Sequence, residues 1–437
     1  MTKFNRRQFL KRAALTAVGF STVGVIRSPL RSQFYSLAQG DGVDLTLMMV
    51  DYSDPVVTAL EDVIIPMFVE ENPGSTVTVN YSAWDRYNEE MTTAFAAGVT
   101  PDVFQGGAVW APQMARRGWA FPLNDFIAAD PDWNWDDFPP GLQADVTVNG
   151  QIVGVPYRQD LRTLWYRTDM LEAAGFSGPP TTWDEFLEVA KATTVKNGNQ
   201  FEVEGYHFSS ASDGWQRDWQ PYLIWLHAAG GQFLSDDLSR CMLDQEPAIR
   251  ALQFIHDMIH VHEVTAYPGL EPQGDVPVIV AGNAAMEFAN ADMERNINLF
   301  APDQAGIVQP ALPLTGEEQA THAWVNKFFV SSQSDYPEEA WGLVRFLTRP
   351  DVLEVYSAAN NNTPPRQSLM SAEYMSEKHQ QVLAAAPYAR TFPQHPNLIA
   401  LFRPIAAELE QALSGNKTPE AALQDATREV NLILEDV

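Results

Sequence analysis

A short polar break between two strand-like runs, near residue 160, divides this chain more sharply than any other feature of its sequence. The first run, residues 152–157, follows the turn pair Asn149-Gly150 and is rich in β-forming residues. Residues 158–160 are polar, and a second β-prone run follows at 163–166. This pattern predicts a strand that leaves one structural unit and a second strand that begins another. We therefore expect a hinge between two lobes at this point.

Helices are expected directly after the second run. Residues 169–174 are bounded by Thr168 or Asp169 as N-cap and by Gly175 as the C-terminal stop. After two prolines, Thr182 and Glu185 stand three residues apart, which is the spacing of a capping box at the start of a helix.

The first 38 residues are typical of an export segment rather than of a folded domain. The pair Arg6-Arg7 begins a twin-arginine motif, and an apolar run follows at residues 13–26. A small-x-small site at residues 36–38 predicts cleavage after Ala38. The single cysteine, Cys241, is far from this site, so no lipid-anchored cysteine can begin the mature chain. We predict a twin-arginine signal peptide at 1–38 and a soluble periplasmic protein.

Length and charge narrow the class of protein. A chain of 437 residues with 45% hydrophobic and 19% charged residues is an ordinary globular protein, and its length favours two domains. The formal net charge is −28 at pH 7, and residues 1–38 carry basic groups but no acidic ones. This acidity argues against nucleic acid and anionic membranes as partners. No other stretch approaches the roughly 18 apolar residues that a membrane span requires.

Alternating strands and helices at the start of the mature chain predict parallel α/β sheets. Strand-like runs at 43–50, 76–81 and 101–104 alternate with helical segments, one of them at 84–97. Ligands of such sheets bind beyond the carboxyl ends of the strands. The residues at or just past such ends are Asp51, Tyr52, Gln105, Gly106 and Trp110.

Two segments contain residues spaced like metal ligands, and for each we favour solvated polar side chains over a metal site. The acidic run 130–137 resembles the start of an EF-hand loop, but Trp135 and Gly141 stand where that loop needs Gly and Glu. A solvated acidic loop held by its tryptophans is favoured over calcium. His256 and His260 are four apart on an expected helix, where a solvated face is favoured over a metal. No metal or cofactor is predicted.

The motifs of common enzymes that sequence alone can show are missing: G-x-S-x-G, the P-loop, G-x-G-x-x-G and H-E-x-x-H. Paired carboxylates of a glycosidase could still meet in space. Aromatic residues beside polar loops are frequent, and a sugar offers flat C–H faces to such rings and hydroxyls to Asp, Asn, Gln and Arg. Core packing remains the commoner role for any one tryptophan. The candidates are Trp84, Trp110, Trp215, Trp219 and Trp324.

Motifs spread over residues 43–437 resemble the extracellular solute-binding proteins of ABC importers, and most of all the carbohydrate-binding family that includes the maltose-binding protein. The stretch 154–185 carries most of this resemblance. The other motifs are Pro101-Asp102-Val103, Gly118-Trp119-Ala120, 228–231, 282–286, Ala340-Trp341 and Pro364-Pro365-Arg366.

The resemblance implies a two-lobed periplasmic-binding-protein fold of type II that closes on its ligand and then docks on membrane permease subunits. The predicted crossings at 158–162, 306–313 and 360–365 give a first lobe of 43–157 plus 312–360 and a second lobe of 158–311 plus 361–437. The ligand residues implied are Asp51, Tyr52, Gln105, Gly106, Asp160, Arg162, Trp215, Asp218, Trp219, Asn290, Asp292, His322, Trp324 and Asn361, and we add Trp84 and Trp110.

Two departures from the resemblance concern the sugar. Asp292 stands where a stacking tryptophan is expected, and His322-Ala323 replaces a common Gly-Gly. We predict a monomeric, non-enzymatic receptor that captures a sugar or oligosaccharide for an ABC importer. An exported carbohydrate-active enzyme is the alternative from another class. A receptor for a polyamine or peptide is the third, and polyamines would suit the acidity.

Overall fold

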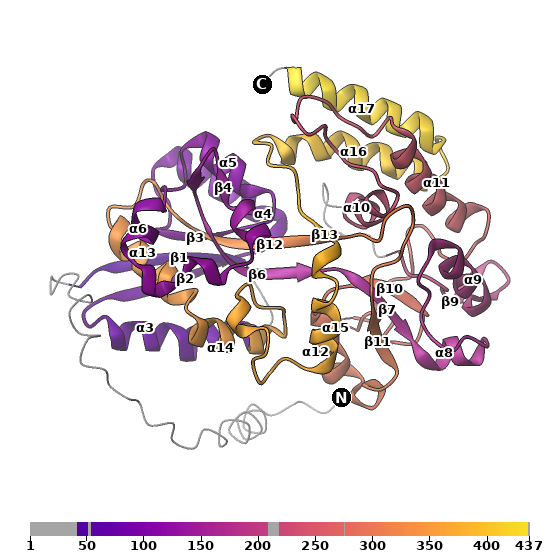
Figure 1. Ribbon diagram of the computed structural model, residues 1–437, viewed down its shortest axis with the longest axis horizontal. Helices are drawn as coiled ribbons and strands as arrows, with labels where there is room; N and C mark the ends of the chain where they lie inside the picture. Colours follow the sequence, from indigo (N-terminus) through magenta and orange to yellow (C-terminus); the bar gives the residue numbers. More distant parts are fainter. Residues whose placement is uncertain (1–41, 51–53, 209–217, 275, 436–437) are drawn as a thin grey trace. The chain divides into compact units, whose positions relative to one another are not determined.

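Strand β1 (Asp44–Val50) is the centre of a group of parallel strands at the beginning of the fold. It pairs in parallel with β2 (Thr76–Ser82) on one side and with β3 (Val103–Gly106) on the other. Helix α4 (Trp84–Ala97) connects β2 to β3. The computed structural model describes residues 42–50, 54–208, 218–274 and 276–435 (Figure 1), and the statements below concern these residues. The signal-peptide prediction lies outside them.

Strand β12 (Thr321–Val330) completes this sheet from a distant part of the chain. It lies antiparallel to β3 and to β6 (Val155–Leu161), and parallel to the short β13 (Ala389–Arg390). The strand order is β13-β12-β3-β1-β2, with β6 paired to β12. The first sheet therefore contains strands from four well-separated segments of the sequence.

The chain passes from the first sheet to the second at Arg162. Strand β6 ends at Leu161, and β7 (Thr163–Arg167) belongs to the other sheet. The polar break predicted at 158–160 is wrong as a break, because these residues continue β6. Their main chains pair with β12, and their side chains are buried. The hydrogen bonds between β6 and β12, rather than the polarity of the side chains, therefore decide where β6 ends. Strands β1 and β7 lie in different sheets, as a two-lobed arrangement requires.

The second sheet has the order β10-β7-β11, with β10 (Met286–Ala289) and β11 (Val308–Ala311) both antiparallel to β7. Isolated parallel bridges join Glu204 to Ala284 and His207 to Glu287, so residues 204–207 run beside β10. The parallel pairing predicted for the start of the mature chain is confirmed for β1, β2 and β3, whereas the strands of the second sheet pair antiparallel. Its strands are not consecutive β–α–β units, so no crossover helix fixes their direction.

The helix after β1 changes its pitch where a proline enters it. Helix α2 (Asp54–Ala59) passes through a π-helical turn (Leu60–Ile64) into α3 (Ile65–Glu71). Pro66 lies in the first turn of α3, where its missing N–H is tolerated, but its ring prevents regular helix through the preceding turn.

Some of the remaining helices pack on strands, and others, such as the last one, pack on neighbouring helices. No helix in the described ranges combines the length and hydropathy of a membrane span. The remaining helices are α5 (Trp110–Arg117), α6 (Asn124–Ala129), α7 (Pro140–Asp145), α8 (Thr168–Ala173), α9 (Trp183–Thr193), α10 (Trp219–Ala228), α11 (Glu246–His260), α12 (Asp292–Phe300), α13 (Pro337–Leu347), α14 (Pro350–Asn360), α15 (Glu377–Leu383), α16 (Leu398–Leu413) and α17 (Pro419–Glu435). Short hairpins are formed by β4 (Thr147–Val148) with β5 (Gln151–Ile152), and by β8 (Val195–Asn197) with β9 (Gln200–Val203).

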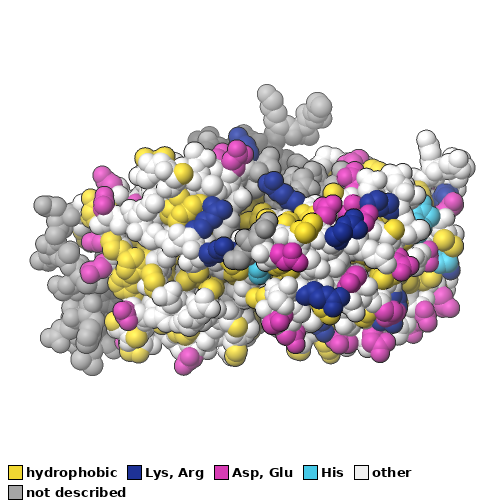
Figure 2. Space-filling view, turned by 90° about the horizontal axis from the view of Figure 1, so that it is seen from above, with side chains coloured by type: hydrophobic (Ala, Val, Ile, Leu, Met, Phe, Trp, Pro, Cys, Tyr) yellow, Lys and Arg dark blue, Asp and Glu magenta, His cyan; other side chains and the backbone are white. Residues whose placement is uncertain are grey.

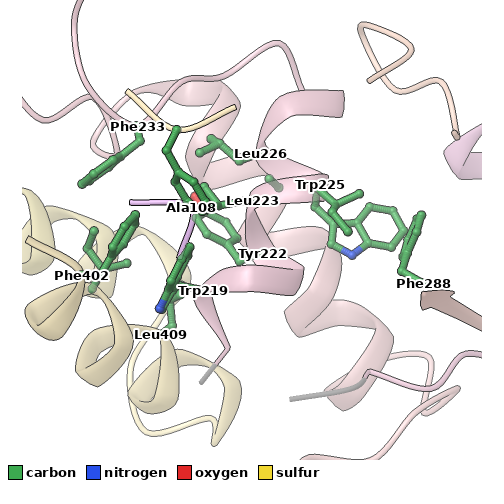
Figure 3. Close-up of a cluster of buried hydrophobic side chains, with 14 of the residues drawn as sticks. Ala108, Trp219, Tyr222, Leu223, Trp225, Leu226, Phe233, Phe288, Phe402 and Leu409 are labelled. Atoms are coloured by element: carbon green, nitrogen blue, oxygen red, sulfur yellow. The ribbon is translucent and has the colours of Figure 1, made fainter. Parts of the chain in front are cut away.

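In the described residues, three apolar clusters pack around the two sheets, and the largest contains residues of both. In one cluster, Leu47 and Phe328 of the first sheet pack with Trp341 of α13. In another, Trp165 and Val308 of the second sheet pack with Ile297 of α12. The largest cluster includes α10, whose side chains lie against α16 in Figure 3. Acidic side chains are scattered over the face drawn in Figure 2, with lysines and arginines in small groups among them.

Candidate functional site

Arg158, on β6, forms ion pairs with two carboxylates. Its Nε lies 2.9 Å from Asp160 Oδ1 on the same strand, and its Nη2 lies 2.8 Å from Asp292 Oδ2 at the start of α12. Side chains two residues apart on a strand point to the same face, which is why Arg158 and Asp160 meet. Strand β6 belongs to the first sheet, whereas α12 follows β10 of the second. The pair Arg158–Asp292 therefore joins the two sheets where the chain crosses between them.

Arg162, the residue between β6 and β7, is held by the first residues of β12. Its amide N donates to the His322 carbonyl (3.3 Å), and its own carbonyl accepts from Thr321 Oγ1 (2.5 Å). The Arg162 guanidinium lies over the Trp324 indole, 5.1 Å from the ring centroid. The rings of His322 and Trp324 are 4.3 Å apart, and His322 Nδ1 is 3.1 Å from His227 Nε2 on α10.

The hinge cluster is the set of six residues that these contacts bring together: Arg158, Asp160, Arg162, Asp292, His322 and Trp324. Five of them were predicted from the sequence as ligand residues. They come from β6, the crossing itself, α12 and β12, so three distant segments of the chain form one polar group.

Buried polar atoms without a hydrogen-bond partner among the described residues gather in and beside the hinge cluster. An unmet buried polar group costs about 1–3 kcal/mol, so such a gathering points to water or a bound solute. Arginine and indole N–H groups donate, carboxylate oxygens accept, and a sugar hydroxyl can do both. The atoms are Arg162 Nε, Asp292 Oδ1, Glu287 Oε2, His322 Nε2 and Trp324 Nε1.

Burial shifts the proton equilibria of this region. It raises the pKa of the Asp292 carboxyl, although the Arg158 charge opposes this. It also raises the pKa of Glu287, against the charges of His207 and Arg162. Burial lowers the pKa of His322 well below its ordinary value, and that of His227 to about 3. Both imidazoles are therefore neutral at pH 7.

A second group of predicted residues gathers after strand β3. Gln105 Oε1 accepts from the Val50 amide (3.1 Å), which ties the ends of β1 and β3 together. A Cβ on Gly106 would lie 2.2 Å from the Phe329 ring, so only glycine fits there. Trp84 is half-buried at the start of α4, and Trp110 is buried at the start of α5. These four residues form the strand-end group of the first sheet.

The start of α10 holds two further predicted residues. Asp218 is buried and accepts a 2.6 Å hydrogen bond from the Tyr267 hydroxyl. Trp219 is 2% exposed and stacks on Phe402, with ring centroids 3.8 Å apart (Figure 3). The structure thus places Trp219 in the core, and its predicted stacking on a sugar receives no support from this position.

Asn290 and Asn361 lie where α12 meets α14. Asn290 Oδ1 accepts from the Asp292 amide (3.2 Å), and Asn361 Nδ2 donates to the Ala291 carbonyl (3.2 Å). Beside them, Arg295 Nη1 donates to the Asn360 carbonyl (3.0 Å). Asn361 therefore joins the end of α14 to the start of α12, whereas the Asn290 contact is local to the start of α12. The predicted residues Asp51, Tyr52 and Trp215 lie outside the described residues.

Arg158 and Glu287 were missed in the sequence. Arg158 lies two residues before Asp160, so strand alternation would have paired them once β6 was recognised as continuous. Glu287 is the single acid in a four-residue buried strand, and a charge at such a position is itself a signal.

The two metal alternatives find no support in the part of the chain that the structure describes, where no group of three or more His, Cys, Asp or Glu could hold an ion. In the run 130–137, Asp137 Oδ1 accepts from the Ser368 amide (2.8 Å), and Asp137 Oδ2 lies 3.2 Å from Arg366 Nη1. His260 Nε2 lies 2.9 Å from the Leu413 carbonyl oxygen. These side chains already serve internal contacts.

Two separate sheets, joined by a strand crossing that carries a buried polar cluster, define a two-lobed binding-protein fold of type II. The family of bacterial extracellular solute-binding proteins matches residues 52–354, and the chain belongs to this family.

Individual relatives agree with this assignment. A protein of Brucella abortus (strain 2308), described only as a binding protein, is 24% identical over 406 residues, which are 91% of this chain and 95% of that protein. The lactose-binding protein of Rhizobium radiobacter is 24% identical over 283 residues, 62% and 63% of the two chains. An ABC transporter solute-binding protein of Thermotoga lettingae, bound to α-D-tagatose, has a TM-score of 0.78 at 27% identity and covers 90% of this chain and 100% of its own.

Proposed function

We propose that this protein captures a sugar or oligosaccharide between its lobes and delivers it to the permease of an ABC importer. The hinge cluster carries this proposal, because it gathers unmet donors and acceptors beside the half-buried Trp324 indole. Two relatives whose names mention a sugar, lactose and α-D-tagatose, support the class of solute.

In the proposed complex each group has a role that follows from its chemistry. The Asp160 carboxylate accepts hydrogen bonds from sugar hydroxyls, and the Arg162 Nε–H and Trp324 Nε1–H donate to sugar oxygens. The indoles of Trp84 and Trp324 offer faces to the C–H side of a ring. These groups hold and orient the sugar, and the protein acts as a receptor that returns it unchanged.

We further propose that the receptor works outside the cytoplasmic membrane as a monomer. The twin-arginine motif at Arg6-Arg7 supports export, and the acidic net charge of −28 disfavours nucleic acid as a partner. The double change Arg6→Lys and Arg7→Lys should leave precursor in the cytoplasm, as judged by N-terminal sequencing of fractionated cells. Normal processing of that variant, or a mature chain that begins far from Gln39, would contradict the export proposal.

The solute class is tested by native mass spectrometry and calorimetry with lactose, maltose, D-tagatose, spermidine and a tripeptide. Intact bound sugar supports the receptor. Cleaved sugar would show the carbohydrate-active enzyme instead. Binding of spermidine or the tripeptide alone would show a receptor for another solute.

A further inference from the structure

Lys327 is a lysine with no exposed surface, in the middle of β12. Its main chain pairs with Gly106, the last residue of β3. Its Nζ donates to the Ala108 carbonyl (3.1 Å) and forms an ion pair with Asp145 at the end of α7. The side chains of Lys327 and Asp145 are 0% and 1% exposed.

Stability does not explain why this pair is present. Two charges lose their hydration on burial, and replacing a buried ion pair by apolar side chains of similar volume is often neutral or stabilising. Burial lowers the pKa of Lys327 and raises that of Asp145, which shows the same penalty. Asp145 Oδ1 is buried and accepts no hydrogen bond from the described residues.

The contact that apolar side chains could not reproduce is the one to Ala108. Ala108 lies two residues beyond β3 and two before α5, in a turn in which the Trp110 amide donates to the Gly107 carbonyl (3.2 Å). Gln105 fixes the beginning of this turn through the Val50 amide. The Lys327 ammonium fixes its middle, so the turn is held from the first sheet at two points.

We propose that Lys327 is a positioning residue, which holds the buried turn 105–110 against the Trp84 indole, with Asp145 holding the ammonium in place. A Cβ on Gly107 of this turn would lie 3.3 Å from the Trp84 ring. The proposal rests on the proposed function, which assigns the Trp84 indole to the C–H face of a sugar ring. Lys327 itself touches no solute.

The direct test is hydrogen–deuterium exchange of a peptide spanning residues 103–112. In the double variant Lys327→Met with Asp145→Leu, the turn should exchange about tenfold faster than in wild type, because it has lost one buried hydrogen bond. In Asp145→Asn, which keeps Lys327 but removes the charge that holds its ammonium, the exchange rate of the turn should lie between those of wild type and the double variant. If the apolar double variant does not fold, Lys327→Gln with Asp145→Asn serves the same test, because glutamine is too short to reach Ala108.

A second buried ion pair provides the matched control. Arg366 and Asp137 pair at 3.2 Å with side-chain exposures of 0% and 8%, and they contact none of the residues 105–110 in the hydrogen bonds and ion pairs described. Arg366→Met with Asp137→Leu should change the melting temperature but not the exchange of the turn. Unchanged exchange of the turn in the Lys327 double variant, or equal loosening in both double variants, would overturn the proposal.

Calorimetric titration with lactose and maltose then separates this inference from the proposed function. If wild type binds either sugar, the Lys327 double variant should bind it about tenfold more weakly at a temperature at which both proteins are folded. Wild-type affinity in that variant would refute the positioning role. If wild type binds neither sugar, the proposed function is in question, while the exchange experiment still decides whether Lys327 holds the turn.

Discussion

Among the candidate tryptophans in the described residues, Trp110 and Trp219 are buried. Trp219 is 2% exposed and stacked on Phe402, whereas Trp84 and Trp324 are half-buried. Trp219→Ala should therefore lower the free energy of unfolding by about 3–5 kcal/mol through the cavity it leaves. Urea unfolding measures this loss, and calorimetry of the folded protein should show unchanged sugar affinity. Weakened binding with unchanged stability would instead restore the stacking role predicted from the sequence.

The affinity for sugar should depend on Asp160. A carboxylate that accepts sugar hydroxyls makes charge-assisted bonds worth about 1.5–3 kcal/mol each, so Asp160→Asn should weaken binding about tenfold or more. The control is Asp169→Asn, which removes a carboxylate that pairs with Arg167 (2.7 Å) on β7, outside the hinge cluster. Calorimetric titration measures the sugar affinity of both variants. Equal affinities of the two variants would show that the sugar binds outside the hinge cluster.

The stacked imidazoles of His227 and His322 should make the protein less stable in acid. The pKa of each is lowered in the folded state, that of His227 to about 3, so below about pH 6.5 the unfolded chain takes up protons first. The stability should therefore fall as the pH drops from about 6.5, and the double variant His227→Gln with His322→Gln should flatten this decline. Melting temperatures between pH 7 and pH 5 measure it. His256→Gln, on α11, is the control, and an equal slope in both variants would contradict the assignment.

The sequence predicted five residues of the hinge cluster because their types suit sugar hydroxyls and the resemblance placed them. It missed Arg158 because only the continuous β6 ladder brings Arg158 beside Asp160 and Asp292. It predicted ligand contact for both Trp219 and Trp324. The stacking of Trp219 on Phe402, a residue of α16 far away in the sequence, cannot be predicted from composition and spacing.

Among the elements, α9 shows how far a local motif can be trusted. Thr182 Oγ1 accepts from the Glu185 amide (3.3 Å), which confirms the predicted cap. The Glu185 carboxylate, however, accepts from the Thr181 amide (2.8 Å), one residue earlier than in a capping box. The sequence showed that the Glu185 side chain would accept a hydrogen bond from an amide at the start of the helix. Whether that amide is Thr181 or Thr182 depends on the direction in which the chain enters the helix.

Loss of this cap should have a modest, measurable cost. Thr182→Ala should lower the free energy of unfolding by about 1 kcal/mol, because the Glu185 amide loses its acceptor. Thr182→Ser keeps an oxygen at the same place and should stay close to wild type. Urea unfolding of the two variants provides the comparison, and equal losses would assign the effect to the Thr182 methyl group instead.

For the whole molecule, the two-lobed fold followed from the sequence, but the lobe limits stay a prediction. Contacts near the third predicted crossing, at 360–365, show why sequence patterns do not predict the lobe limits. Arg366 pairs with Asp137 of the segment between α6 and α7, whereas His379 lies 3.1 Å from Glu294 on α12. A polar stretch with prolines predicts an irregular segment. Which of the two sheets that segment packs against is decided by tertiary contacts.

Closure of the lobes on a sugar should make the molecule more compact. Hinge motion absorbs its backbone changes in a few residues, here at Arg162 and the other crossings. Small-angle scattering should therefore show a smaller radius of gyration when a saturating sugar is added, and no change with a sugar that does not bind. An unchanged radius with a bound sugar would mean that the lobes are already closed without it.

The place of β12 in the first sheet also sets the order in which the two sheets can be finished as the chain is made. The strands β10, β7 and β11 are all present once residue 311 has been synthesised, whereas the first sheet, begun at residue 44, cannot join β3 to β6 before residues 321–330 appear. Until then β3 and β6 each present unpaired edges, the kind of surface that promotes aggregation of incomplete chains. The lobe that starts first is thus the one whose sheet is completed last.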